Sequence, residues 1–315
     1  MTAHLFVLDP LEALLPDADT SIAFMREAAS RGDAVSSVEI HGMSLDSGRP
    51  QGVCTELELL DGGKWYRAGE TRRRYLDEFD VVWMRKDPPF DQAFYYSTHV
   101  LSMIDASTLV VNDPAALRDA NEKLFALRFP TCCPESLVSS NQDELLAFRE
   151  TLGGEMIVKP LDGAGGEGIF HITANDRNAK AILEVSTDHG TRLTLAQRYI
   201  PEIRQGDKRI ILIEGEPAGA VLRVPLATEA RANFHVGGTA QKTELTDRER
   251  EICAEVGPIV REMGIVFAGI DVIGDWLTEV NVTSPTGIRE IAELDGVNLE
   301  VQVVDAVAQR LAQRR

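Results

Sequence analysis

Three residues near the end of the chain carry side-chain oxygen atoms at a spacing that could bind a metal ion. Asp271 lies near the end of the apolar segment 265–273, and Glu279 and Asn281 lie in the extended segment 276–282. Side chains two positions apart on a strand point to one face, and Asp271 joins that face if the segments pair as a hairpin. Buried carboxylates need partners and oxygen ligands suit Mg²⁺, so the pattern predicts a magnesium site shared with nucleotide phosphates. A solvent-facing hairpin with ordinary polar residues is the alternative.

The segment VKPLDGAGGEGIF places Lys159 at the end of an apolar strand and four glycines after it. The glycines match the letters of the dinucleotide-binding fingerprint, but that motif must open a helix, and the Gly-Lys-Ser/Thr of a P-loop is absent from the segment. Four glycines are more than a plain turn needs, and the exposed N–H groups of such a loop can bind phosphate. We therefore expect a phosphate-binding hairpin containing Gly163, Gly165 and Gly166; a plain turn is the alternative.

Other basic and polar side chains are candidates for the same chemistry. Lys123, in NEKLF, is a second candidate phosphate cation, although a lone lysine usually lies on the surface. Arg209 and Arg223 fall in neighbouring expected strands, and arginine binds phosphate or carboxylate through two hydrogen bonds. Ion pairing with the chain's own Asp and Glu residues is the alternative. Gln197 and Tyr199 end another apolar strand, whose backbone could pair with a purine; an ordinary strand end is the alternative.

The composition limits the classes of function. The chain has 315 residues and a formal net charge of −18, which argues against binding to a nucleic acid backbone. No apolar run approaches the ~20 residues of a membrane helix, and the N-terminus lacks the basic region of a signal peptide. The four cysteines show no metal-binding spacing, so we expect free thiols in a reducing cytoplasm.

The first third of the chain alternates apolar segments with helical patterns, which predicts a parallel sheet covered by helices. A polar β-hairpin is expected at residues 52–70 and a helix at residues 115–129. Ligands of parallel sheets bind beyond the carboxyl ends of strands. Polar residues follow the expected strands at Asp9, at residues 84–87, and at Asn112 and Asp113.

Beyond residue 130 the pattern changes to mostly antiparallel strands with a few helices, which is typical of an α+β layout. Residues 225–244 show no strand or helix pattern and contain Gly237 and Gly238. A loop of this length inside a domain is commonly a lid, which would exclude water from a reactive intermediate.

Several motifs occur together in one order: the opening LDP, RKDPPFD, NEKLF, VKPLDGAGGEGIF, GDKRI and AGIDVIGDWLTEVNVTSPTGIREI. With them the chain resembles the prokaryotic glutathione synthetase family of ATP-grasp ligases from Leu8 to about Leu311. The resemblance implies an N-terminal α/β domain, residues 1–120, and an α+β ATP-grasp domain, residues 121–315. ATP would lie between a small lid subdomain, about 130–200, and a metal-binding subdomain, about 201–315.

The resemblance also implies a reaction. Enzymes of this family join γ-glutamylcysteine to glycine with ATP and Mg²⁺, for which Mn²⁺ could substitute. The dipeptide carboxylate takes the γ-phosphate to give an acyl phosphate, and the glycine amine then attacks it, giving glutathione, ADP and phosphate. No protein nucleophile is needed, in agreement with the lack of a convincing Ser–His or Cys–His pair. We expect a cytoplasmic homo-oligomer, a tetramer or a dimer, with small-molecule substrates and no nucleic acid or membrane partner.

The family's motifs imply roles for individual residues. Asp271, Glu279 and Asn281 would hold two Mg²⁺ ions, and Arg209 and Arg223 would stabilise the transferring phosphoryl group. The residues expected to bind ATP are Lys123, Lys159, Gly163, Gly165, Gly166, Gln197, Tyr199, Ile200 and Asp207. The residues expected to contact the substrates are Arg85, Lys208, Arg231, Asn233, Ser284, Pro285 and Thr286.

The chain departs from the family pattern at Gly287, where Cys is common, in the tail that follows REI, and in one longer segment. Residues 225–244 have alanines around Arg231 and Asn233, where the family is glycine-rich. This keeps open an alternative function, a related ATP-grasp amide ligase with a different acid or amine substrate. A nucleotide-binding protein without turnover is a further alternative, which the complete set of metal-binding residues disfavours.

Overall fold

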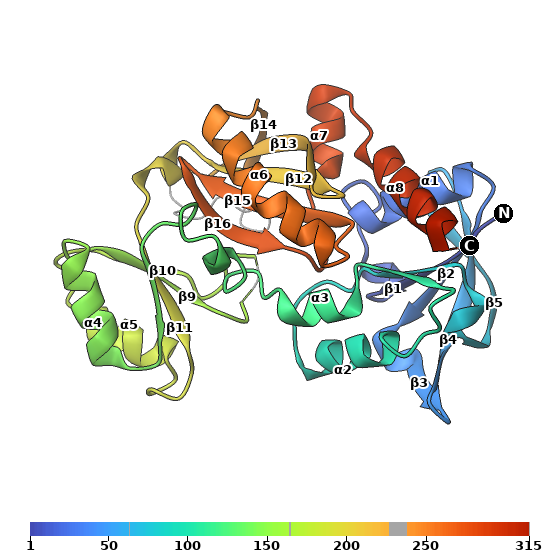
Figure 1. Ribbon diagram of the computed structural model, residues 1–315, viewed down its shortest axis with the longest axis horizontal. Helices are drawn as coiled ribbons and strands as arrows, with labels where there is room; N and C mark the ends of the chain where they lie inside the picture. Colours follow the sequence, from blue (N-terminus) through green and yellow to red (C-terminus); the bar gives the residue numbers. More distant parts are fainter. Residues whose placement is uncertain (63, 164, 227–237, 315) are drawn as a thin grey trace.

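The computed structural model describes residues 1–62, 64–163, 165–226 and 238–314, and it contains three β-sheets with their helices (Figure 1). A smaller sheet, which we call the middle sheet because it is built from residues 136–198 in the middle of the sequence, lies at one end of the molecule in this view. The C-terminal sheet lies between it and the N-terminal sheet. Within the described residues, no helix has the length and apolar character needed to span a bilayer.

The N-terminal sheet contains β1 (Ala3–Leu8), β2 (Ala34–Glu39), β3 (Met43–Asp46), β4 (Arg49–Leu59), β5 (Tyr66–Tyr75), β6 (Val81–Met84) and β7 (Leu109–Val111). β1 pairs in parallel with β2 and β6, and β6 pairs in parallel with β7, which confirms the predicted parallel sheet. β4 runs antiparallel to β2, β3 and β5. The predicted hairpin at 52–70 is therefore present as β4 and β5, at one edge of the sheet.

Helices α1 (Thr20–Ser30), α2 (Gln92–Leu101) and α3 (Pro114–Asp119) each begin after an aspartate. The carboxylates of Asp19, Asp91 and Asp113 accept hydrogen bonds from N–H groups of the first turns, which have no partner within the helix. Asp113, one of the polar residues at a strand end, is thus used as a helix cap.

The helix predicted at residues 115–129 is wrong beyond Asp119. α3 ends at Asp119, and Ala120 has non-helical backbone angles of φ −98° and ψ 69°. The Asn121 Oδ1 atom then accepts hydrogen bonds from the N–H groups of Lys123 (3.1 Å) and Leu124 (3.0 Å). Such local side-chain bonds compete with helical hydrogen bonds, so the chain turns at this point.

The middle sheet contains β8 (Ser136–Ser139), β9 (Met156–Pro160), β10 (Phe170–Ile172) and β11 (Thr194–Arg198), all antiparallel. Helices α4 (Gln142–Thr151) and α5 (Ala179–Ser186) share a buried core with one face of this sheet, which includes Val158 and Ala196. Side chains alternate along a strand. Lys159 and Gln197 therefore point to the opposite face, away from the two helices.

The C-terminal sheet contains β12 (Asp207–Ile213), β13 (Glu216–Val224), β14 (Thr239–Lys242), β15 (Phe267–Ile273) and β16 (Trp276–Asn281), in the order β14-β13-β12-β15-β16. Its helices are α6 (Asp247–Glu262), α7 (Ile288–Asp295) and α8 (Leu299–Arg314). β14 corrects the prediction that residues 225–244 lack regular structure, because its backbone pairs with β13. The rest of the predicted lid falls largely on residues 227–237, outside the described residues.

The N-terminal and C-terminal sheets are joined through Asn112, at the end of β7. Its amide donates to the carbonyls of Phe267 (2.8 Å) and Val282 (2.7 Å) and accepts from the N–H groups of Val266 and Phe267. Helix α8 returns to pack on α1, so both ends of the chain lie at the N-terminal sheet (Figure 1). Asn112, the other polar residue at this strand end, is therefore occupied in holding the two sheets together.

Candidate active site

The three predicted metal ligands meet on one face of the β15–β16 hairpin. Asp271 pairs directly with Glu279, and Asn281 pairs with Gly269 in the same ladder. The Asn281 Nδ2 atom lies 3.2 Å from Asp271 Oδ2. Asp271 is only 2% exposed, so the alternative of a solvent-facing hairpin is wrong for this residue.

Two buried arginines bind the carboxylate of Asp271. Arg209 donates from Nε to Oδ1 (2.5 Å) and from Nη2 to Oδ2 (2.9 Å), and Arg223 Nη2 lies 3.0 Å from Oδ1. Burial alone would raise the pKa of Asp271, but the two guanidinium groups outweigh it and lower the pKa to about 2. Asp271 is therefore ionised at neutral pH. The ion pairing that the sequence left open as an alternative is present in the structure.

Asp207 shares Arg223 with Asp271. It accepts a hydrogen bond from Arg223 Nη2 at 2.5 Å, across the direct β12–β13 pair. Burial and repulsion by Asp271 raise the pKa of Asp207 to about 6, against the attraction of Arg223 and Arg209. Asp207 Oδ1 and Arg223 Nε have no hydrogen-bond partner in the described part of the chain. Buried polar atoms without partners are rare and suggest a missing ligand.

The donor set on β15 and β16 fits a hard divalent cation. Asp271 is ionised, Asn281 carries an amide oxygen, and no described residue makes a hydrogen bond or ion pair with the Glu279 carboxylate. Oxygen-only sets of this kind suit Mg²⁺ or Mn²⁺ more than zinc or copper. The residues therefore fit the metal ion that the sequence predicted.

Lys159 and the glycine loop lie on the middle sheet. Lys159 is 7% exposed, and its ammonium group has no hydrogen bond or ion pair with any residue that the structure describes. The loop joins β9 to β10, and Gly165 and Gly166 have positive φ angles of 63° and 85°. A Cβ atom on Gly163 would lie 2.7 Å from Pro160 Cγ, too close for any other residue. The predicted glycine-rich hairpin is thus present.

Lys123 reaches the same loop from the turn after α3. It is 2% exposed, and its ammonium binds the carbonyl of Gly163 (2.6 Å) and the carboxylate of Glu122. Burial and repulsion by Glu279 raise the pKa of Glu122 to about 7, against the attraction of Lys123. The sequence analysis missed Glu122, although it precedes Lys123 in NEKLF.

Gln197, Tyr199 and Ile200 lie at and just beyond the end of β11. Gln197 is buried and donates from Nε2 to Ser136 Oγ (3.0 Å), and Ile200 is buried. Tyr199 stacks on His171, with ring centroids 4.0 Å apart and an angle of 17° between the planes. His171 was also missed; it is held at Nε2 by Glu155 Oε1 (2.8 Å).

Arg85 lies against the turn that follows β16. Its guanidinium donates to Ser21 Oγ (3.1 Å) and to the carbonyl of Pro285 (3.3 Å), and Ser284 Oγ donates to the Arg85 carbonyl (3.4 Å). Burial lowers the pKa of Arg85 to about 10, so it stays charged at neutral pH. Arg209 binds the Thr286 carbonyl (3.2 Å). The turn therefore connects Arg85 to Arg209, which binds Asp271.

Lys208, a predicted substrate contact, lies apart from Arg209, Arg223 and Asp271. Its ammonium donates to Glu249 Oε2 (2.8 Å) and to the Glu244 carbonyl (2.9 Å), which lie on or beside α6. Lys208 alternates with Asp207 and Arg209 on β12, so it points to the other face of the sheet. The predicted substrate contacts Arg231 and Asn233 lie outside the described residues.

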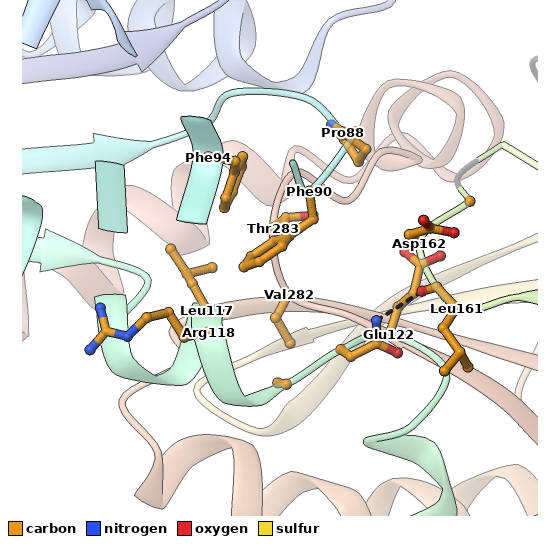
Figure 2. Close-up of a pocket in the computed structure, with 13 residues that line it drawn as sticks. Pro88, Phe90, Phe94, Leu117, Arg118, Glu122, Leu161, Asp162, Val282 and Thr283 are labelled. Atoms are coloured by element: carbon orange, nitrogen blue, oxygen red, sulfur yellow. Dashed lines mark hydrogen bonds between the residues drawn. The ribbon is translucent and has the colours of Figure 1, made fainter. Parts of the chain in front are cut away.

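A cavity of about 220 Å³ lies beside the glycine loop (Figure 2). Pro88, Phe90 and Phe94 line one side, and Glu122 and Asp162 line the other. Apolar side chains facing a few polar groups are usual for small-molecule sites. Leu117, Arg118, Ala120, Asn121, Leu161, Gly163, Val282 and Thr283 complete the lining.

Solved structures with the same architecture are ATP-grasp proteins. D-cycloserine synthetase DcsG has a TM-score of 0.68 and 14% identity, covering 98% of this chain and 99% of that one. A RimK domain ATP-grasp protein from Sphaerobacter thermophilus has a TM-score of 0.63 and 18% identity, covering 97% and 99%. Identities this low establish the fold alone. The chain therefore has the ATP-grasp fold, and the match of residues 122–296 to an ATP-grasp domain model identifies it as an ATP-dependent carboxylate–amine ligase.

Sequence comparison gives the family. The model of the N-terminal domain of prokaryotic glutathione synthetase matches residues 2–118, and the model of its ATP-grasp domain matches residues 122–296. Glutathione synthetase of Gloeobacter violaceus is 48% identical, covering 96% of this chain and 95% of its own length. The Synechococcus elongatus enzyme is 46% identical, covering 96% and 97%. The chain belongs to the prokaryotic glutathione synthetase family.

Proposed function

We propose that this protein is a glutathione synthetase, which ligates γ-glutamylcysteine to glycine and converts ATP to ADP and phosphate. The observation that carries the proposal is that both parts of the chain match models of this one family. The metal-binding face, the glycine loop and the buried arginines supply the groups that such a reaction needs.

Asp271, Glu279 and Asn281 would hold Mg²⁺, in a proposed number of two ions, and Mn²⁺ could replace it because it prefers the same ligands. When bound, the metal neutralises charge on the phosphates. The ammonium of Lys159, which no residue of the described ranges binds, supports a phosphate at this position, because a buried charge needs a counter-charge. Lys123 and the loop glycines Gly163, Gly165 and Gly166 would bind the same phosphates.

The other end of the nucleotide would lie along β11. Gln197, Tyr199 and Ile200 would line the adenine, with the Tyr199 ring held in place by His171. Asp207 would bind the ribose, and its unpartnered Oδ1 atom supports this role. The ATP site would then lie between the middle sheet and the C-terminal sheet.

The carboxylate of γ-glutamylcysteine attacks the γ-phosphorus, which gives an acyl phosphate and ADP. The glycine amine then attacks the carbonyl carbon, the C–N bond forms, phosphate leaves, and the amine loses a proton. Arg209 and Arg223 would stabilise negative charge on the transferring group, as fixed donors do in a site closed to water. Arg85 and the turn of Ser284, Pro285 and Thr286 would bind the acid substrate. Lys208, Arg231 and Asn233 are proposed substrate contacts without further support.

We also propose that the enzyme works in the cytoplasm as a homo-oligomer, a dimer or a tetramer. The four cysteines, all free and buried, support a reducing compartment. The proposed domain division is 1–120 for substrate binding and 121–315 for the ATP-grasp part, with a lid subdomain at about 130–200 and a metal-binding subdomain at about 201–315.

The test is phosphate release from ATP and Mg²⁺ with γ-glutamylcysteine, measured with and without glycine, and mass analysis of the product. Glycine-dependent release with tripeptide formation supports the proposal. Release that requires a different acid or amine would identify a related amide ligase instead. Glu279→Gln is the negative control, because it keeps the size of the side chain and removes the charge that would bind the metal.

A further inference from the structure

Glu122 belongs to a segment that touches both the metal-binding hairpin and the glycine loop. Its carbonyl accepts a hydrogen bond from the Val280 N–H (2.9 Å), between Glu279 and Asn281 on β16. The preceding residue, Asn121, donates from Nδ2 to the Leu161 carbonyl (2.8 Å), at the start of the loop. The backbone thus fixes the place of Glu122 independently of its own side chain.

The Glu122 side chain, in contrast, is committed to Lys123. The buried ammonium of Lys123 has two partners among the described residues, the carboxylate of Glu122 and the Gly163 carbonyl. Lys159, the other candidate phosphate cation, has none. The two lysines therefore differ: the charge of Lys159 is open to a ligand, and the charge of Lys123 is already neutralised.

Glu122 also lines the cavity of Figure 2, opposite Phe90 and close to Asp162, so a ligand in the cavity or over the loop can reach it. A phosphate that approaches Lys123 must share the ammonium with the carboxylate or displace it. The two anions compete for one buried cation, and in a site of low dielectric this competition costs more than it would in water.

We infer that Glu122 is a positioning residue: without nucleotide it holds Lys123, and this competition makes nucleotide binding depend on the metal ion. A divalent cation on the β15–β16 hairpin supplies the positive charge that Lys123 does not offer while it is paired. Without the cation, the phosphates meet a neutralised lysine and the carboxylates of Asp271 and Glu279. The inference rests on the proposed nucleotide site.

The test measures ADP binding by calorimetry at pH 8, where Glu122 is ionised, with Mg²⁺ and with EDTA in its place. Glu122→Gln keeps the side-chain size and the backbone bond to Val280. Because it frees Lys123, we expect ADP binding to tighten about tenfold in EDTA and by less than about threefold with Mg²⁺. Glu58→Gln, an exposed residue paired with Arg67 on another sheet, is the matched control for the change in charge.

A Lys123→Met background shows whether the effect passes through Lys123. There the effect of Glu122→Gln in EDTA should fall below about twofold. If Glu122→Gln weakens ADP binding equally with and without Mg²⁺, Glu122 has a structural role only. If Glu122→Gln tightens ADP binding in EDTA as much in the Lys123→Met background as in the unmodified protein, Glu122 repels the nucleotide directly. Either result overturns the inference. If the unmodified protein binds no ADP, or Lys123→Met leaves ADP binding unchanged, the proposed nucleotide site itself fails.

Discussion

Arg209 and Asp271 are direct cross-strand partners on β12 and β15, and the guanidinium binds both carboxylate oxygens, at 2.5 and 2.9 Å. A proposed metal ligand is therefore held by a residue proposed to act on the phosphoryl group. Arg223 binds the same carboxylate at 3.0 Å. The two arginines keep Asp271 ionised and fix its position.

Asp271 and Glu279 should differ in their effect on stability. Asp271→Asn leaves the buried Arg209 without its counter-charge and leaves Arg223 with Asp207 alone, and we expect the free energy of unfolding to fall by about 3–5 kcal/mol. Glu279→Gln should change it by less than about 1 kcal/mol, because no described residue pairs with Glu279. Urea denaturation without metal measures both. Equal losses in the two variants would contradict the structural role of the arginine pairs.

Lys159 should matter for ligand binding and not for folding. Lys159→Met removes a buried charge that has no partner among the described residues and keeps most of the side-chain volume, so the melting temperature should stay the same or rise. ATP binding should weaken by about tenfold or more, the usual scale for losing a charged hydrogen bond. Lys180→Met, at an exposed position on α5, is the control. A clear loss of stability in the Lys159 variant would show that its ammonium has a structural partner.

Glu122 should make the free energy of unfolding depend on pH. Its pKa is raised from 4.5 to about 7, so the native state binds more protons than the unfolded state between these values. Stability contributed by the protonated carboxyl is present below about pH 4.5 and is lost as the pH rises to about 7. In Glu122→Gln this loss of stability does not occur. The free energy of unfolding that the variant keeps at high pH is up to about 1.4 kcal/mol for each unit of the pKa shift.

The measurement is urea denaturation of both proteins at pH 5, 6, 7 and 8 without metal. The difference in unfolding free energy should move in favour of Glu122→Gln as the pH rises, most steeply between pH 5 and 7. Two parallel curves would mean that Glu122 titrates at its ordinary value.

Asn112 should be needed to hold the N-terminal and C-terminal sheets together. Asn112→Ala leaves the N–H groups of Val266 and Phe267 and two carbonyls without partners, and we expect a loss of about 2–4 kcal/mol in the free energy of unfolding. Hydrogen exchange should become faster at β7 and β15. Asn178→Ala is the control, because Asn178 is exposed and its side chain caps no helix. Unchanged exchange at β15 would show that other contacts hold the sheets.

Features set by neighbours in the chain were predictable. Glu279 and Asn281 share a face because strand side chains alternate, and a tight turn brings Asp271 to them. The same alternation could have shown that Lys208 points away from Asp207 and Arg209. The helix beyond Asp119 was wrongly predicted because the apolar pattern continues there, while the side chain of Asn121 bonds to the backbone and turns the chain.

The sequence by itself determined the fold class, the glycine loop and a set of candidate residues for binding metal and phosphate, because these follow from side-chain periodicity, turn chemistry and motif order. Only the tertiary structure decided which charges meet. Arg209 and Asp271 are 62 residues apart, and Lys123 and Gly163 are 40 apart. Such contacts depend on strand register and on how the sheets pack, and no local pattern encodes them. Charge pairs and pKa values at the site are therefore properties of the folded chain.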